Sequence, residues 1–189
     1  MDRRRKFLFT GPTGVGKTTA IAQISDDEPV ATEMAASGEL AVTKTTTTTA
    51  LDFGQVRLED GEVIGLYGTP GQQRFDYMWT LLQERAMGLV ILIDHSRPGS
   101  LTDLQRYLDG FGELIAQTGA VIGLTRADSE AGPAIDAYHE CVAEYGYMLP
   151  VIECDIRRAE DVRLLMEAVI SMAEPLADDQ GALPKENES

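Results

Sequence analysis

Cysteine is scarce in this chain, since Cys141 and Cys154 are the only two among 189 residues. The pair lacks metal-ligand spacing and offers no disulfide framework, which argues against a small secreted domain and favours a reducing compartment. Neither histidine, His95 or His139, belongs to a pattern that builds a metal centre or a nucleophile–base pair. We therefore interpret these four side chains as structural.

Long apolar runs and positive charge are also missing. No stretch approaches the roughly 18 residues of a transmembrane helix, and the first residues lack a signal-peptide core. Lysine and arginine number 16 against 31 aspartates and glutamates, and the resulting net charge of −15 repels nucleic acid and anionic lipid. We therefore expect a cytoplasmic protein with no nucleic-acid partner and no direct membrane anchor, which reaches a membrane only through recruitment by a partner.

What is present fits one domain with a short tail. At 189 residues, 43% of them hydrophobic and 25% charged, the chain has room for one sizeable core. Apolar periodicity fades near residue 173, after which proline, aspartate and glutamate are frequent. We predict a single globular domain over residues 1–173 and an acidic disordered tail over residues 174–189.

The most informative segment is GPTGVGKT at residues 11–18, which follows the apolar run Phe7–Phe9 and precedes a helical pattern. Its three glycines free consecutive backbone N–H groups to curl around a β-phosphate at a helix N-terminus. Lys17 would neutralise β- and γ-phosphate charge, and Thr18 would offer its hydroxyl to Mg²⁺. The motif predicts a nucleoside triphosphate site, because a chance glycine-rich turn explains neither the full spacing nor the strand–loop–helix context.

Apolar runs alternate with helical patterns along the chain, as in a parallel sheet covered by helices on both faces. The Asp60-Gly61 step suits a two-residue hairpin turn, so one pair of strands should be antiparallel. The sequence thus predicts an α/β P-loop NTPase fold, a three-layer αβα arrangement whose mostly parallel six-stranded sheet contains one antiparallel hairpin strand. The expected strands are residues 6–10, 49–58, 62–68, 87–94, 120–125 and 150–154.

Helical stripes and one long connection separate these strands. A helix is expected over residues 101–117, with Ser100 and Asp103 forming a capping-box-like start. Residues 25–47 show no core periodicity and run into the threonines at 45–49, so we interpret them as a long surface connection and a candidate switch. Two further helices are expected around Ile135, Tyr138, Val142 and Tyr145 and around Val162, Leu165, Met166 and Val169.

A second motif, GTPGQQRF at residues 68–75, follows an apolar strand. It resembles the Asp-x-x-Gly-Gln loop of the Ras/Arf superfamily of small GTPases. The resemblance implies that the Gly71 N–H senses the γ-phosphate and that Gln72 orients the attacking water. An ordinary proline-glycine turn would explain the bend but neither the glutamine nor the hairpin before it. Gly68 stands where the family usually has a carboxylate near Mg²⁺; Asp94 could partly replace it, although capping of the following turn explains Asp94 better.

A closer resemblance is to bacterial Ras-like GTPases of the gliding-motility and actinobacterial conservon type. It spans residues 6–172 and implies a partner of the Roadblock/LC7 type that prefers the triphosphate form, with exchange and activating factors unspecified. The expected aromatic anchors for that partner are Phe75 and a partly exposed Trp79. The segments that carry the resemblance are residues 48–54, 71–79 and 94–98.

The candidate switch segments supply a metal ligand and the partner surface. By resemblance Thr48 donates its hydroxyl oxygen to Mg²⁺, while Thr46 and Thr47 remain open as alternatives. Only segments whose order depends on the γ-phosphate can bias binding between two nucleotide states. We therefore expect the partner surface at residues 45–54 and 72–82.

Base recognition is expected from the loops after the fifth and sixth strands. Residues 125–128, Thr-Arg-Ala-Asp, resemble the family's Asn-Lys-x-Asp motif, in which the acid accepts hydrogen bonds from guanine N1–H and the exocyclic amine. Adenine does not offer two donors at those positions, so Asp128 favours GTP. Thr125 replaces a loop-bracing amide, and Arg126 can lay its stem and guanidinium over the base. By resemblance Ile156 offers its backbone N–H to the guanine carbonyl.

We predict a partner-stimulated GTPase that binds GTP or GDP with Mg²⁺, hydrolyses GTP slowly and signals through its switch loops. Turnover should be slow because no arginine finger immediately precedes Thr48. The alternatives are a nucleotide-loaded scaffold without useful hydrolysis and a P-loop ATPase or small-molecule kinase. The predicted residues are Gln72 and Lys17 for catalysis; Gly11, Gly14, Val15, Gly16, Lys17, Thr18, Thr19 and Gly71 for phosphate; Thr125, Arg126, Asp128 and Ile156 for the base; Thr18 and Thr48 for metal.

Overall fold

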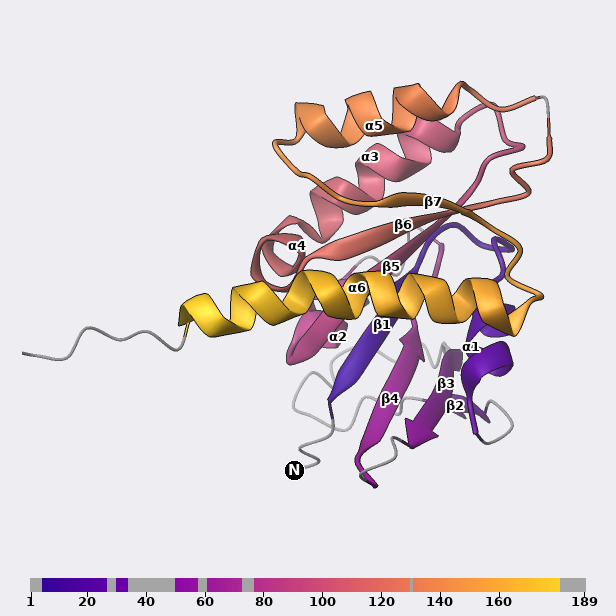
Figure 1. Ribbon diagram of the computed structural model, residues 1–189. Coiled ribbons are helices and arrows are strands. Elements are labelled where there is room, and N and C mark those ends of the chain that lie inside the picture. Colours follow the sequence, from indigo (N-terminus) through magenta and orange to yellow (C-terminus); the bar gives the residue numbers. More distant parts are fainter. Residues whose placement is uncertain are drawn as a thin grey trace, which may run out of the picture.

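The computed structural model describes residues 5–26, 30–33, 50–57, 61–72, 77–129 and 131–180. Within these residues the chain forms strands and helices in the alternation that the sequence predicts (Figure 1). The strands are β1 (Lys6–Thr10), β2 (Val30–Glu33), β3 (Ala50–Arg57), β4 (Val63–Gly68), β5 (Ala86–Asp94), β6 (Ala120–Thr125) and β7 (Val151–Cys154). The helices are α1 (Lys17–Ile24), α2 (Tyr77–Gln83), α3 (Ser100–Gly110), α4 (Gly112–Thr118), α5 (Ile135–Glu144) and α6 (Ala159–Gln180).

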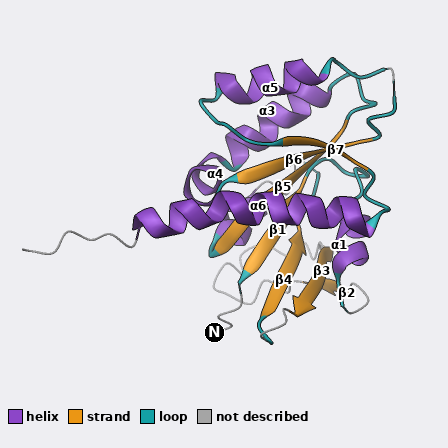
Figure 2. Cartoon of the chain, viewed as in Figure 1, coloured by secondary structure: helices purple, strands orange, loops and turns teal. Residues whose placement is uncertain are grey.

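The strands form one sheet in the order β2-β3-β4-β1-β5-β6-β7 (Figure 2). The central strand β1 pairs in parallel with β4 and β5, and β6 and β7 continue the parallel part. The β3–β4 hairpin is antiparallel and places Asp52 opposite Gly68. The α/β class, the mostly parallel sheet and the antiparallel hairpin are therefore confirmed.

One part of the expected long connection is a strand. Residues Val30–Glu33 form β2, which pairs antiparallel with β3 at the sheet edge, so the sheet has a seventh strand that the sequence analysis did not predict. Four residues are too few to show a clear alternation, and the partner strand that templates them begins only at Ala50. Residues 34–49, which include the threonine run, lie outside the described residues.

The two faces of the sheet carry separate apolar clusters, because successive side chains of a strand point to opposite sides. In β5, Leu89, Ile91 and Ile93 join one cluster, whereas Val90 and Leu92 join the other. The first cluster includes residues of α2, α3, α4 and α5, and the second includes residues of α1 and α6. The sheet is thus the middle layer of the expected αβα arrangement (Figure 1).

The helix expected over residues 101–117 is interrupted. Helix α3 ends at Gly110 and α4 begins at Gly112, with Phe111 between them at φ −118°. Glycine is a poor helix former, and a Cβ on Gly110 would overlap the Trp79 ring. The lack of a side chain at Gly110 therefore leaves room for the tryptophan, which stacks on Phe111 with ring centroids 4.8 Å apart.

The last two helices lie where the apolar stripes predict them, as α5 and α6. Helix α6 continues to Gln180, so it extends into the segment 174–189 that was predicted to be a tail. Residues 181–189 lie outside the described part of the chain. Among the residues that the structure describes, none of the helices combines the length and apolarity needed to cross a membrane.

Candidate functional site

The loop between β1 and α1 has a shape that requires glycine. Gly11, Gly14 and Gly16 have φ angles of 142°, 80° and 106°, where side chains are strained. A Cβ on Gly16 would also overlap the side chain of Ile156. No side chain caps α1 at Gly16, so the first N–H groups of this helix are left for an anion.

The predicted phosphate residues that follow have different environments. Val15, a residue of the loop itself, is buried, whereas Thr18 and Thr19 are exposed on the first turn of α1. Lys17 is only 7% exposed, and its Nζ donates to the carbonyl oxygens of Gly11 at 2.7 Å and Pro12 at 2.9 Å. Burial lowers the pKa of Lys17 to about 8, although the Asp52 carboxylate acts in the opposite direction. The loop therefore holds a cation where a polyphosphate needs one.

Asp52 is a site residue that the sequence analysis missed. Its Oδ2 accepts a hydrogen bond from Thr18 Oγ1 at 2.6 Å, although the two residues belong to β3 and α1. Asp52 lies opposite Gly68 in the hairpin, and a Cβ on Gly68 would be 3.0 Å from both Cβ and Oδ2 of Asp52. The glycine therefore leaves room for a carboxylate from the neighbouring strand, close to the position at which the second motif lacks an acid.

The loop after β4 is fastened to the loop after β1. Thr69 N donates to Phe9 O at 2.8 Å, and the hydroxyl oxygens of Thr10 and Thr69 lie 2.7 Å apart in a buried hydrogen bond. Gly71 lies against the phosphate loop so closely that a Cβ on it would be 2.5 Å from Thr13 N. Gln72 follows as an exposed residue. The second motif is therefore in direct contact with the first.

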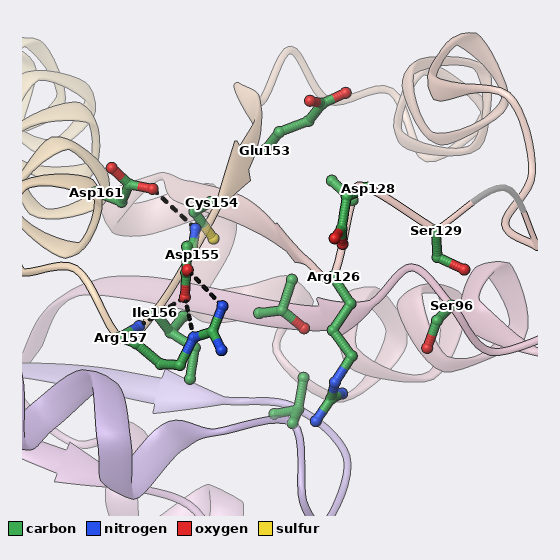
Figure 3. A pocket seen from close by; sticks show the side chains of 13 residues that line it. Ser96, Arg126, Asp128, Ser129, Glu153, Cys154, Asp155, Ile156, Arg157 and Asp161 are labelled. Atoms are coloured by element: carbon green, nitrogen blue, oxygen red, sulfur yellow. Dashed lines mark hydrogen bonds and ion pairs between the residues drawn. The ribbon is translucent and has the colours of Figure 1, made fainter.

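The expected base-binding residues surround one cavity of about 790 Å³ (Figure 3). Thr125, Arg126 and Asp128 come from the loop after β6, Ile156 comes from the loop after β7, and Val15 comes from the phosphate loop. The structure thus brings together four predicted residues that the chain separates by about thirty positions. The cavity opens at the carboxyl ends of parallel strands, where α/β sheets bind ligands.

Arg126 is held at the cavity by two contacts. Its guanidinium forms an ion pair with the Oδ2 of Asp94, and its NH2 group donates to Gly14 O at 3.4 Å. The other carboxylate oxygen of Asp94 accepts from the N–H of Ser96 at 3.1 Å and its hydroxyl at 2.6 Å. Asp94 therefore caps its turn, as the sequence favoured, and also positions Arg126. Thr125 is buried and donates to Ile93 O at 3.3 Å, so it braces the end of β5.

The loop after β7 is built around Asp155. The N–H of Asp155 donates to Asp161 Oδ2 at 2.8 Å, which ties the loop to α6. The Asp155 carboxylate accepts from Arg157 Nε at 2.8 Å and from its NH2 group at 2.7 Å (Figure 3). This bidentate contact lowers the pKa of Asp155 to about 2. Cys154 is buried beside it, and burial raises the pKa of its thiol to about 12, which keeps the thiol unreactive.

The aromatic anchors have different outcomes. Trp79 is 3% exposed and packs against Tyr107 and Phe111, so the expectation of a partly exposed indole is wrong; the side chain belongs to the core. Its apolar surface fills the gap beside Gly110, which sequence periodicity alone does not reveal. Phe75, like the metal ligand expected at Thr48, lies outside the described residues.

The oxygen atoms beside the phosphate loop fit a hard divalent cation. Mg²⁺ prefers oxygen ligands and usually keeps waters and phosphate oxygens in its shell, so it needs few protein donors. Thr18 Oγ1 and Asp52 Oδ2, which lie 2.6 Å apart, are two such donors. No group of three histidine, cysteine or carboxylate side chains that could hold a metal occurs among the described residues. Any Mg²⁺ here would therefore depend on a bound nucleotide for most of its ligands.

A glycine-shaped loop at a helix N-terminus, a buried lysine and an adjacent cavity at the sheet edge define a P-loop nucleotide-binding protein of the α/β class. A comparison with protein families agrees with this class, and residues 27–174 match the family described as "Conserved hypothetical ATP binding protein". The chain belongs to this family, since the match covers most of its length. A comparison with curated proteins gives no match.

Proposed function

We propose that this protein is a guanine-nucleotide switch that hydrolyses GTP slowly in the presence of Mg²⁺. The position of Gly71 against the backbone of Thr13 carries this proposal. A γ-phosphate bound at the loop between β1 and α1 would meet the N–H of Gly71, so its loss would change the contacts of the segment that leads into α2. A switch needs this coupling, whereas a simple nucleotide store does not.

The residues around the phosphates have distinct proposed roles. Lys17 and the N-terminal N–H groups of α1 would bind the β- and γ-phosphates, and Gln72 would orient the attacking water. Thr18 and Asp52, with Thr48 from the switch segment, would hold Mg²⁺. The ion, when bound, would neutralise the charge that develops on the phosphate oxygens. No side chain forms a covalent intermediate in this proposal.

Asp128 supports guanine as the base. It lines the cavity and is exposed to it, so its carboxylate is available to accept from guanine N1–H and the amino group. Ile156 lies on the other loop, where its backbone N–H would meet the guanine carbonyl. Adenine has no two adjacent donors for the Asp128 carboxylate, and the proposed preference follows from this difference.

The first test is to identify the nucleotide that copurifies with the protein, by chromatography after denaturation. We expect GDP or GTP, and adenine nucleotide alone would overturn the guanine proposal. The second test is single-turnover GTP decay in the Gln72→Ala variant, with Gln117→Ala, at an exposed position of α4, as the matched control. We expect slower decay only in the first variant. Equal decay in both would remove the proposed role of Gln72, and decay of the unaltered chain no faster than that of free GTP would leave a nucleotide-loaded scaffold as the better description.

ATP is the second candidate nucleotide, because the family description names ATP. An ATPase would use the same phosphate loop, since the loop contacts phosphates and not the base. Direct competition between ATP and GTP for the purified protein separates the two candidates. A preference for ATP would keep the phosphate-site assignments and remove the role of Asp128.

We also propose a Roadblock/LC7-type partner that prefers the triphosphate form. Because Trp79 is buried, the large hydrophobic side chains that α2 exposes to a partner are Tyr77, which is 68% exposed, and Leu81, which is 57% exposed. They are four residues apart and therefore share one face of the helix. Pull-downs with a candidate Roadblock dimer should recover more protein with a non-hydrolysable GTP analogue than with GDP, and less from the Tyr77→Ala variant. Equal recovery in both nucleotide states would remove the switch interpretation.

A further inference from the structure

The three residues Thr69, Pro70 and Gly71 follow β4, and each contacts a different part of the molecule. The N–H of Thr69 donates to Phe9 O, near the end of β1, at 2.8 Å. Gly71 lies against the phosphate loop. Proline has no N–H, so its carbonyl is the one backbone group through which Pro70 can be held. That carbonyl accepts a hydrogen bond from the indole Nε1 of Trp79 in α2, at 3.4 Å. The loop is therefore fastened to α2 between its contacts with β1 and with the phosphate loop.

The peptide group between Pro70 and Gly71 connects this hydrogen bond to the phosphate loop. A trans peptide group is planar, and its C=O and N–H point in opposite directions. The Pro70 carbonyl and the Gly71 N–H belong to the same peptide group. A donor that fixes the direction of this carbonyl therefore also fixes the direction of the Gly71 N–H, which points away from Trp79.

The indole that donates this hydrogen bond is itself held firmly. Trp79 is 3% exposed, and its ring stacks on Phe111 with an interplanar angle of 29°. The Arg106 guanidinium lies 5.2 Å from the ring centroid, and the ring occupies the space that a Cβ on Gly110 would take. Indole has one donor and no acceptor, so a ring packed in this way offers its N–H in a single direction.

Helix α2 is also attached to α3 at a second point. The Nε2 of Gln83, the last residue of α2, donates to Gly110 O at 3.1 Å. Packing against α3 alone would be served by a phenyl ring, whereas a buried indole N–H needs an acceptor. The acceptor here is the carbonyl next to the proposed γ-phosphate contact, and it lies outside the helices that surround the ring.

We propose that Trp79 is a positioning residue for the γ-phosphate, because its N–H holds the Pro70 carbonyl and thereby orients the N–H of Gly71. The proposal rests on the proposed sensing of the γ-phosphate by Gly71. It gives Trp79 a part in the discrimination between triphosphate and diphosphate, in addition to its part in the core. A donor that is oriented before the ligand arrives loses little freedom on binding, so Trp79 contributes to triphosphate affinity without touching the ligand.

The experiment changes one group of the indole. Benzothienylalanine in place of Trp79 keeps the shape of the side chain but has sulfur instead of the N–H, and Trp79→Phe is the genetically encoded counterpart. Isothermal titration measures the affinities for the diphosphate and a non-hydrolysable triphosphate of the purine that the unaltered chain binds more tightly. We expect the ratio of triphosphate to diphosphate affinity to fall roughly three- to tenfold in both variants, as for the loss of one hydrogen bond. Diphosphate affinity should stay within about twofold.

Two further variants serve as controls. Phe111→Leu loosens the same aromatic stack but leaves the indole N–H in place, so it should lower the thermal unfolding temperature and keep the affinity ratio within about twofold. Gly71→Ala is the positive control, because its Cβ would be 2.5 Å from Thr13 N and would displace the sensing peptide. It should lower the affinity ratio by about tenfold or more.

Each other outcome would overturn the proposal at a different point. An unchanged ratio in the benzothienyl variant, with a lower ratio in Gly71→Ala, would remove the role of Trp79 and leave the switch proposal standing. An unchanged ratio in both would end the γ-phosphate contact of Gly71 and the switch proposal with it. Equal weakening of both nucleotides in the benzothienyl variant would assign the N–H to the stability of the loop. A fall in Phe111→Leu as large as in the benzothienyl variant would assign the effect to core packing.

Discussion

The two ends of the proposed nucleotide site are built in opposite ways. At the phosphate end, Lys17 is 7% exposed and its partners are backbone carbonyls, and a buried hydrogen bond between Thr10 and Thr69 joins the two adjoining loops. At the base end, Arg126, Asp128 and Arg157 are exposed, and the arginines are positioned by aspartate side chains. Backbone and buried groups thus shape one end, and exposed charged side chains shape the other.

This difference separates affinity from selectivity. Backbone N–H groups and a buried ammonium recognise any polyphosphate, because every nucleoside triphosphate presents the same charges to them. Exposed side chains can be exchanged at small cost to the fold, since surface substitutions change stability little. Substitutions at the phosphate end should therefore affect all nucleotides alike, whereas those at the base end should change which nucleotide binds.

The largest effect is expected from Lys17→Ala. Removing a charged donor from the phosphates should weaken GTP and ATP alike by roughly 10- to 150-fold, as measured by equilibrium titration. Lys6→Ala is the control. Lys6 is also a lysine, but it lies at the start of β1, at the end of the strand away from the phosphate loop. Near-native affinity in Lys17→Ala would remove the phosphate-site interpretation.

The next effect concerns Asp52, which joins the phosphate end from a neighbouring strand. Asp52→Asn keeps the size of the side chain but removes its negative charge, so Mg²⁺ should enhance GTP affinity about tenfold less than in the unaltered chain. Titrations with and without Mg²⁺ measure this enhancement. Asp136→Asn, at an exposed position in the first turn of α5, is the charge-matched control. An unchanged Mg²⁺ effect in Asp52→Asn would show that this carboxylate is only a hydrogen-bond partner of Thr18.

At the base end, Asp128→Asn should reduce guanine affinity several-fold and move the preference toward xanthine, whose C2 carbonyl needs a donor where guanine has an amine. Competition between GDP and xanthosine diphosphate measures the change. Glu153→Gln removes a carboxylate from the same cavity and should leave the preference as it is. If Asp128→Asn leaves the choice of base unchanged, residues 125–128 do not recognise the base.

The smallest effect is a dependence on pH. Lys17 carries its charge below its pKa of about 8, so its attraction for phosphate is nearly complete at pH 7 and declines as the pH rises through 8. Nucleotide affinity should fall about fourfold between pH 7 and 8.5. Lys17→Arg keeps its charge over this range and should flatten the profile. A fall of the same size in Lys17→Arg would assign the titration to another group.

The parts of the site that could be predicted are those that depend on local sequence. The phosphate loop is one continuous segment, and the residues after β6 and β7 follow recognisable strand ends, so their meeting at one sheet edge follows from the parallel topology. Asp52 could not be found in this way, because its contact with Thr18 depends on the register of the hairpin. The sequence nevertheless contains an indication of this residue. Gly68 stands where the resembling family has an acid, and a glycine at that position leaves room for a carboxylate on the paired strand.

The errors of the sequence analysis have physical causes of the same kind. Strand β2 is four residues long and gains its structure from pairing with β3, which no local pattern encodes. The break between α3 and α4 lies where Trp79 packs on Gly110, which is a contact between distant segments. Gly110 and Gly112 are poor helix formers, however, and this local signal indicates a break. The same contact with Gly110 helps to bury Trp79.

The burial of Trp79 has a practical consequence, because it is the only tryptophan of the chain. Its indole N–H lies 3.4 Å from Pro70 O, within the loop that carries Gly71, and the Arg106 guanidinium lies 5.2 Å from its ring. The protein therefore contains a built-in optical reporter beside its second motif. Intrinsic fluorescence excited at the red edge of the tyrosine band should therefore report nucleotide binding to the adjoining loops in real time, without an added label.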